Sequence, residues 1–131
     1  MLKALLIASF PSQVIACSTL ASEAVLNADG ERFGELAHIV IDMTTGRIAY
    51  GVVARGGVFG IGEKLFAIPW SAFSLDPARE CMVLDIAAER LDAAPGFDKD
   101  HWPEMADPAW AMDVHRYYES PACRFSGSRP Q

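Results

Sequence analysis

Residues 55–70 read RGGVFGIGEKLFAIPW, and the fold depends on how this stretch is interpreted. Four glycines fall within the first eight residues, and they are followed by a lysine and an apolar run that ends in Pro69 and Trp70. A glycine-rich loop can cradle a phosphate when it leads from a strand into a helix, because the N-terminal amides of the helix face the ligand. The same glycines can also let the chain turn sharply between two strands.

The residues that follow the glycines argue against a phosphate site. A Walker loop requires G-x-x-x-x-G-K-[ST], and here Glu63 occupies the lysine position. Residues 64–70 then alternate as a strand does, so that no helix N-terminus is available to the ligand. The sequence therefore predicts a β–β connection that binds no nucleotide, with Phe59 and Ile61 at its tip.

The chain on both sides of this loop has the rhythm of short strands. Residues 23–36 indicate a strand, an Asn-Ala-Asp-Gly turn and a second strand start, because Asp-Gly pairs favour tight turns. Residues 36–55 indicate a hairpin that turns at Thr-Thr-Gly. One face of its first strand is predicted to carry the apolar residues Ala37, Ile39, Ile41 and Met43. Pro69 should end its strand or lie on an edge, because it has no N–H to donate.

About six short strands with one apolar face each predict an all-β fold, a small barrel wrapped round a single core. The alternating pattern of the strands ends near Ala87, and residues 87–94 can form a short helix. Asp107 and Pro108 are a sound helix start, since the first can cap the helix and the second needs no N–H there. This helix should run to about Tyr118 and carry an apolar stripe of Trp110, Val114, Tyr117 and Tyr118.

Composition excludes several classes of function. The 131 residues carry a net charge of −6 and no basic stripe, so direct nucleic-acid binding is not expected. No run of about 20 apolar residues is present, so no membrane span is expected. The three cysteines, Cys17, Cys81 and Cys123, have neither metal-ligand nor disulfide spacing, which is typical of a reducing cytoplasm. A lipoprotein signal that ends at Cys17 is an alternative, but residues 11–13 interrupt its apolar stretch.

Residues 27–53, NADGERFGELAHIVIDMTTGRIAYGVV, followed by residues 60–76, GIGEKLFAIPWSAFSLD, resemble the PRC-barrel domain. This domain occurs in the photosynthetic reaction centre H subunit, in a ribosome maturation factor and in many stand-alone bacterial proteins. The match is closest to the stand-alone group, whose typical tail is also similar to residues 94–118. The resemblance implies a barrel of about six strands, in which residues 14–16 form the first strand. It also implies a docking or assembly module rather than an enzyme.

No catalytic, cofactor or metal site is predicted. The three histidines, His38, His101 and His115, could join Asp98, Asp100 or Glu104 in a metal site, but none has ligand spacing, and solvated or structural histidines are the simpler interpretation. The same carboxylates lack a predictable burial that would shift a pKa toward general acid–base work. No serine has the glycine context of a nucleophile elbow. We therefore expect no enzyme activity.

The predicted organisation is an N-terminal extension (1–13), a PRC-barrel domain (14–92), an aromatic and acidic arm with a short helix (93–119) and a disordered tail (120–131). The predicted function is a non-catalytic cytoplasmic adaptor that associates with itself, as a homodimer, and with an unidentified protein. The alternative is a barrel that binds a small ligand or a metal, with a role in stress physiology. The arm aromatics either pin the arm to its own barrel or contact a partner. The predicted interface residues are Phe59, Ile61, Trp102, Trp110, Val114 and Tyr117.

Overall fold

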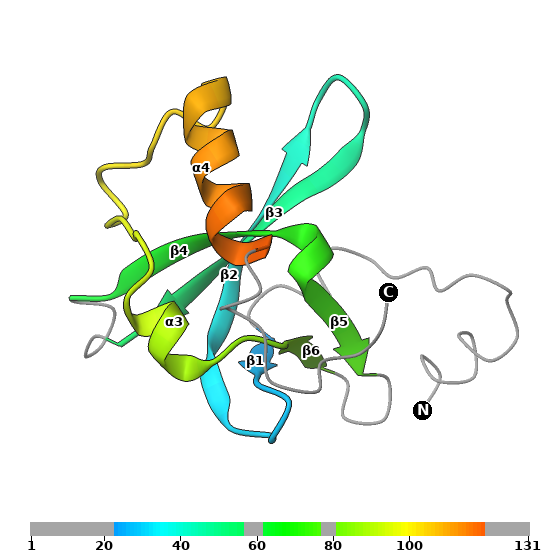
Figure 1. The fold of residues 1–131 in the computed structure, drawn as a ribbon, viewed down its shortest axis with the longest axis vertical. Coiled ribbons are helices and arrows are strands. Elements are labelled where there is room, and N and C mark those ends of the chain that lie inside the picture. Colours follow the sequence, from blue (N-terminus) through cyan, green and yellow to red (C-terminus); the bar gives the residue numbers. More distant parts are fainter. Residues whose placement is uncertain (1–22, 57–61, 77–80, 120–131) are drawn as a thin grey trace, which may run out of the picture.

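The computed structural model describes residues 23–56, 62–76 and 81–119, and Figure 1 shows their arrangement. The elements, in chain order, are β1 (Ala24–Leu26), β2 (Arg32–Asp42), β3 (Arg47–Arg55), β4 (Lys64–Pro69), the 3₁₀ turn η1 (Trp70–Ala72), β5 (Phe73–Asp76), β6 (Cys81–Leu84), α3 (Ala88–Asp92) and α4 (Pro108–Glu119). The chain is therefore mostly β with a C-terminal helical arm, as the sequence predicts.

The six strands form one sheet in the order β4-β3-β2-β1-β6-β5. All pairs are antiparallel except β1 with β6, which are parallel. The two edge strands, β4 and β5, follow one another in the chain and are joined directly by η1. The sheet is therefore curved so that its two ends come together at this corner, which is how a short chain builds a barrel-like core.

The first turn is built round Asn27, which is 2% exposed. Its Oδ1 accepts hydrogen bonds from the backbone N–H groups of Asp29 and Glu31, both at 2.9 Å, and its Nδ2 donates to the Glu31 carboxylate at 2.9 Å. Gly30 has a φ of 90°, which only glycine adopts without strain. The predicted Asp-Gly turn is confirmed, and the buried amide side chain explains its geometry.

The glycine-rich stretch joins two strands that lie side by side, because Arg55 of β3 pairs with Lys64 of β4. The predicted β–β connection is confirmed, and Pro69 ends the edge strand β4 as expected. Residues 57–61 lie outside the described residues, and so do the predictions that fall on Phe59 and Ile61. The same holds for the predicted strand at residues 14–16, for Cys17 and for the tail from residue 120.

The prediction that one apolar face continues along the whole of β2 is wrong at the far end of the strand. Ile41 is 46% exposed and Met43, just beyond the strand, is 90% exposed. The register of β2 on β3 shifts between Leu36 and His38 and again between Val40 and Ile41. The first shift leaves Ala37 of β2 without a partner and the second leaves Ala49 of β3 without one, so only the first changes the facing of the later β2 residues. Strict alternation therefore fails in β2 at Ala37, whereas the exposure of Ile41 and Met43 follows from their place at the end of a hairpin that outruns the other strands.

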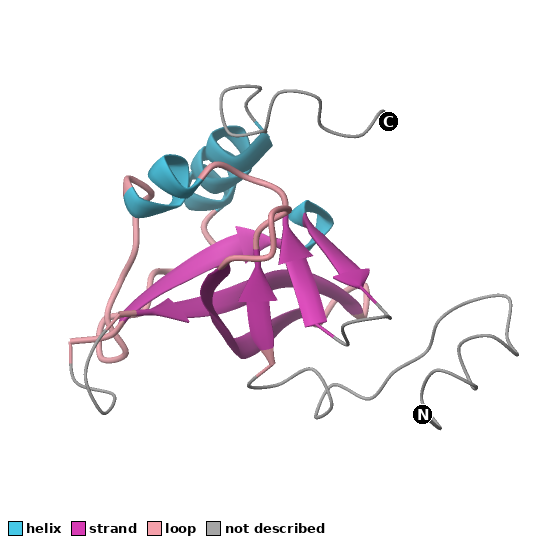
Figure 2. Cartoon of the chain, turned by 90° about the horizontal axis from the view of Figure 1, so that it is seen from below, coloured by secondary structure: helices cyan, strands magenta, loops and turns pink. Residues whose placement is uncertain are grey.

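A single core is also too simple a description, because β3 is buried on both faces. On the inner face, Val53 is paired with Leu36 of β2 and Phe66 of β4, and all three belong to the main core. On the outer face, Val52 and Ala54 form a second apolar cluster with Leu65 of β4. Figure 2 shows helices α3 and α4 on one side of the sheet. There the helices and residues 93–107, which join them, can cover the outer face of the sheet.

Gly51 sits where the inner face of β3 meets the opposite wall of the core. A Cβ at this position would lie 2.9 Å from the Phe73 ring and 3.0 Å from Leu36 Cδ1. We expect Gly51→Ala to lower the free energy of unfolding by about 1–3 kcal/mol through overpacking, measured by chemical denaturation. Adding Phe73→Leu should remove part of the clash, so the double variant should lose less than the sum of the two single variants. Strict additivity would contradict this packing.

Candidate interaction surface

The arm, residues 93–119, is attached to the edge strand β4 through Phe97. The Phe97 N–H donates to the Leu65 carbonyl at 2.9 Å, and the Leu65 N–H donates to the Phe97 carbonyl at 2.8 Å. Gly96 makes this approach possible, because a Cβ there would lie 2.9 Å from the Leu65 carbonyl oxygen. The Phe97 side chain packs on the outer cluster of Val52, Ala54 and Leu65. The arm thus covers both an unpaired strand edge and an apolar face.

Helix α4 begins where the sequence predicts. The Asp107 carboxylate accepts a hydrogen bond from the Ala109 N–H at 3.0 Å, which caps the helix, and Pro108 occupies its first position. The helix then runs to Glu119, one residue beyond the predicted end. Because the cap fixes the start of the helix, it also fixes which side chains face the barrel.

The predicted apolar stripe of α4 faces its own barrel. Val114 is 5% exposed and belongs to the main core, and Trp110 is half-buried with its ring centroid 5.3 Å from that of Tyr50. The Tyr117 hydroxyl donates to the Arg90 carbonyl, and the Arg90 guanidinium lies 4.4 Å from the centre of the Tyr117 ring. In this structure the stripe therefore packs within the chain.

A small cavity remains between the arm and β4, and we call it the arm pocket. Its volume is about 60 Å³, several times the roughly 10–15 Å³ that a cavity needs to hold one water. It is lined by Ala67, Pro95, Gly96, Phe97, Pro103, Trp110 and Val114. The lining is apolar and aromatic. The pocket is far smaller than the roughly 300–1,000 Å³ of a typical cofactor site, so it could hold part of one side chain but no cofactor.

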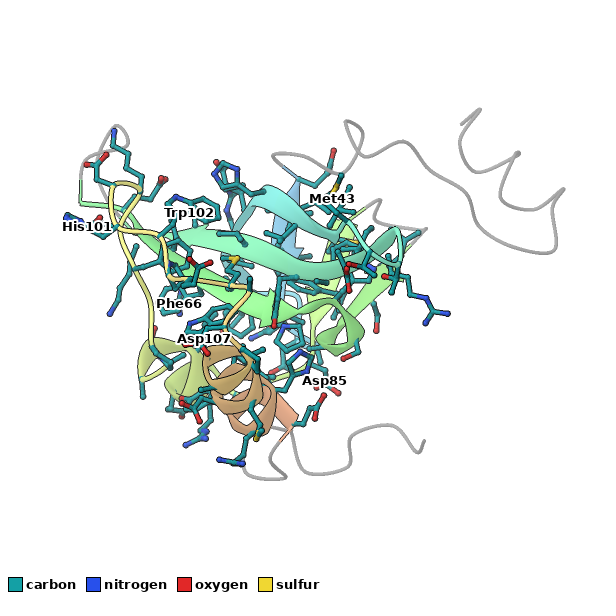
Figure 3. The ribbon with its side chains drawn as sticks, turned by 90° about the horizontal axis from the view of Figure 1, so that it is seen from above. Met43, Phe66, Asp85, His101, Trp102 and Asp107 are labelled. Atoms are coloured by element: carbon teal, nitrogen blue, oxygen red, sulfur yellow. The ribbon has the colours of Figure 1, made fainter. Side chains whose placement is uncertain are left out.

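Trp102 lies beside the arm pocket and is 41% exposed. Its ring centroid is 5.1 Å from that of His38 on β2 and 5.0 Å from that of Phe97. Figure 3 shows Trp102 near the same end of the molecule as His101, away from Met43. A large aromatic side chain that is held on two sides and open on another is a typical anchor for a protein partner.

The β2–β3 hairpin carries a second exposed apolar surface, the hairpin tip (residues 41–48), which projects from the body in Figure 1. Its turn is fixed because the Asp42 carboxylate accepts hydrogen bonds from the N–H groups of Thr44 and Thr45, at 2.9 and 3.4 Å. The Gly46 N–H donates to the Asp42 carbonyl at 2.7 Å, and Gly46 has a φ of 77°. Exposed Met43 and Ile41 are thus presented on a rigid turn.

The hairpin tip is not among the predicted interface residues, although the sequence carries a signal for it. Strand β2 has 11 residues and β3 has 9, whereas the other strands have 3 to 6. Two strands that outrun their neighbours must extend beyond the barrel, where apolar side chains lose their cover. The length of the alternating pattern could therefore have indicated that Ile41 and Met43 are exposed.

The six predicted interface residues do not form one surface. Trp102 is exposed, Trp110 and Tyr117 are half-buried against the barrel, and Val114 is buried. Phe59 and Ile61 lie outside the described residues. The structure brings Trp102 and Trp110 to the same region, because Phe97 contacts Trp102 and lines the pocket with Trp110.

The histidines are each engaged with a different neighbour. His101 Nδ1 lies 2.7 Å from the Asp98 carboxylate, His115 Nδ1 lies 3.2 Å from the Glu119 carboxylate, and His38 contacts the Trp102 ring. Within residues 23–56, 62–76 and 81–119, no group of three or more His, Cys, Asp or Glu side chains is placed to hold a metal ion. No helix in these ranges is long and apolar enough to cross a bilayer.

The packing of α4 on the barrel makes a direct prediction about stability. Trp110→Ala removes a half-buried indole that contacts Tyr50, and we expect the free energy of unfolding to fall by about 2–4 kcal/mol. Met112→Ala on the same helix is the matched control, because Met112 is 57% exposed, and it should change stability by less than about 0.5 kcal/mol. Equal effects of the two changes on thermal and chemical melting would show that the stripe does not pack on the barrel.

The Asp98–His101 pair predicts a pH-dependent contact in the arm. The hydrogen bond that His101 donates to Asp98, and then the charge of Asp98, raise the pKa of His101 above the ordinary 6.5, and the same hydrogen bond lowers the pKa of Asp98 below the ordinary 3.8. The contribution of His101 is complete below pH 6.5 and is lost as the pH rises through its folded pKa. The contribution of Asp98 is complete above pH 3.8 and is lost as the pH falls through its folded pKa.

Both contributions are therefore present together between pH 3.8 and 6.5. An NMR titration of the His101 ring should give a pKa above 6.5, and Asp98→Asn should lower it toward that value. Asp113→Asn, which removes a carboxylate from the outer side of α4, is the control and should leave the titration unchanged. A His101 pKa that is the same in the wild-type chain and in Asp98→Asn would contradict the contact.

Comparisons with known proteins agree with the architecture. No curated protein matches the chain. The family model of the PRC-barrel domain matches residues 12–91, which is more than half of the 131 residues, and the match ends within α3, before the arm begins. The strand order, the glycine-rich β3–β4 connection and this match lead to one conclusion: the chain belongs to the PRC-barrel domain family.

Proposed function

We propose that this chain is a non-catalytic adaptor that associates with itself through the hairpin tip and also docks another protein. Membership of the PRC-barrel family supports an interaction or assembly module. Self-association is inferred from the exposed apolar residues Met43 and Ile41, which a rigid turn holds away from the core. The spacing of the cysteines supports a cytoplasmic location.

The filled interior of the barrel favours a module over a ligand-binding barrel. The largest side chains on its inner side are fully buried and in mutual contact, among them Leu36, Ile68 and Leu84. A barrel that binds a small molecule needs an interior cavity lined by a few converging polar groups. The described core instead consists of apolar side chains. We therefore assign the function to the outside of the barrel.

The exposure of Met43 is the single observation that carries the proposal. A methionine that is 90% exposed at the end of a fixed hairpin gains apolar burial only when another molecule covers it. The flexible thioether also adapts to an irregular partner surface, which is why methionine is common at binding surfaces. A second copy presents the same apolar hairpin, so two tips can cover one another in a two-fold dimer.

Self-association should respond to a charge at the hairpin tip. We expect Met43→Glu to lower the association constant at least tenfold, because a carboxylate placed in an apolar contact loses its hydration. Sedimentation velocity over a concentration series measures the effect. At concentrations where both chains are monomeric the melting temperature should stay the same, because the side chain is exposed in the monomer.

Met112→Glu is the matched control, since Met112 is also exposed but lies on α4 rather than on the hairpin. It should leave the association constant within a factor of two. Equal losses in both variants would show that general charge repulsion acts instead of a hairpin contact. A wild-type chain that remains monomeric at high micromolar concentration would reject self-association altogether.

A further inference from the structure

The segment of the chain that contributes to the arm pocket is acidic. The segment between Phe97 and α4 carries four exposed carboxylates: Asp98, Asp100, Glu104 and Asp107. Each of them lies within three residues of a side chain that lines the pocket. Two exposed ammonium groups are nearby, Lys99 in the same segment and Lys64, whose side chain lies against Gly96. Four negative and two positive charges leave a net charge of −2 in this region while His101 is neutral.

Two of these carboxylates differ from the others in their hydrogen bonding, although the charge of Asp100 also acts on His101. Asp98 is bonded to His101 and to the Asp100 N–H, and Asp107 caps α4. The side chains of Asp100 and Glu104 make no hydrogen bond or ion pair with any described residue. They therefore keep their full capacity to accept hydrogen bonds from a visiting cation.

The apolar part of the site suits the stem of a long cationic side chain. Phe97 and Trp110 line the pocket, and Trp102 offers its exposed part beside it. Lysine and arginine bury their methylene stems on apolar surface while the charged head stays at the rim. A cation near an aromatic ring is also attracted by the ring quadrupole, most strongly by tryptophan. Concave aromatic walls and nearby carboxylates are the two halves of such a recognition site.

We propose that the arm pocket, Trp102 and the carboxylates of Asp100 and Glu104 bind a lysine or arginine side chain in a basic segment of a partner protein. The inference rests on the proposed adaptor function and names the chemistry of its partner. The net charge of −6 adds a long-range attraction for a basic segment, and the pocket adds the local contact. This surface is separate from the hairpin tip, since Figure 3 places Met43 away from Trp102 and His101.

The three tryptophans of the full chain, Trp70, Trp102 and Trp110, provide an internal comparison. The probe is a synthetic peptide of six arginines, and the matched probe is a peptide of six glutamates. The indole N–H signals are followed by NMR during titration of the full-length protein at low salt. We expect the signals of Trp102 and Trp110 to shift with six arginines and that of Trp70, which lies in η1, to stay in place. Six glutamates should shift none of the three signals.

Two pairs of substitutions separate local recognition from general charge attraction. Asp100→Asn with Glu104→Gln should weaken hexa-arginine binding at least fivefold. Glu89→Gln with Asp113→Asn removes the same charge from exposed positions on α3 and α4 and should change binding by less than twofold. Trp102→Ala should also weaken binding at least fivefold, with a thermal melt to confirm that the variant is folded.

Equal weakening by the two double variants would overturn the proposal, because it would show attraction to the overall charge. Shifts of Trp70 as large as those of Trp102 would overturn it as well. Hexa-arginine binding and self-association can also be tested separately. Trp102→Ala should leave the association constant in sedimentation velocity unchanged, whereas Met43→Glu should leave the hexa-arginine shifts of Trp102 unchanged.

Discussion

Strand β3 sets the central constraint on this molecule, because it is apolar on both faces. Its inner residues Gly51 and Val53 face the barrel core, and its outer residues Val52 and Ala54 would face water without a cover. A fully buried valine contributes roughly 1.5–3 kcal/mol relative to an exposed one, so an open outer face would be costly for a small domain. The chain resolves this by folding its own C-terminal arm back over the sheet.

The attachment of the arm is local and specific. Phe97 adds one residue of pairing to the edge of β4, Gly96 allows that approach, and α4 brings Trp110 and Val114 against the barrel. Covering the edge also removes a template for unwanted strand pairing. The family match ends at residue 91, so the arm lies outside the matched residues. With the arm on the outer face, the large apolar side chains that stay exposed among the described residues are Ile41 and Met43 at the hairpin tip, Trp102 beside the arm pocket and Met112 on α4.

Local chemistry explains which features could be predicted from the sequence. The Asp29–Gly30 turn, the end of β4 at Pro69 and the cap at Asp107 each depend on a few adjacent residues, and the structure has all three. The exposure of Ile41 and Met43 could not be read from alternation alone, because it depends on how far the β2–β3 hairpin reaches beyond the neighbouring strands. The contact of Phe97 with Leu65 spans 32 positions and leaves no periodic signal in the sequence. The stripe of α4 was predicted correctly, but only tertiary packing decides whether it faces the barrel or a partner.

Hydrogen–deuterium exchange measured at low and high protein concentration tests most directly whether the arm covers its own barrel while the hairpin tip meets another copy. Peptides from α4 and from the Phe97 region should be protected to the same degree at both concentrations, because their cover comes from within the chain. Peptides that contain residues 39–49 should gain protection as the concentration rises. Protection of α4 that grows with concentration, together with a hairpin whose exchange does not change, would contradict this account and place the interface on the arm.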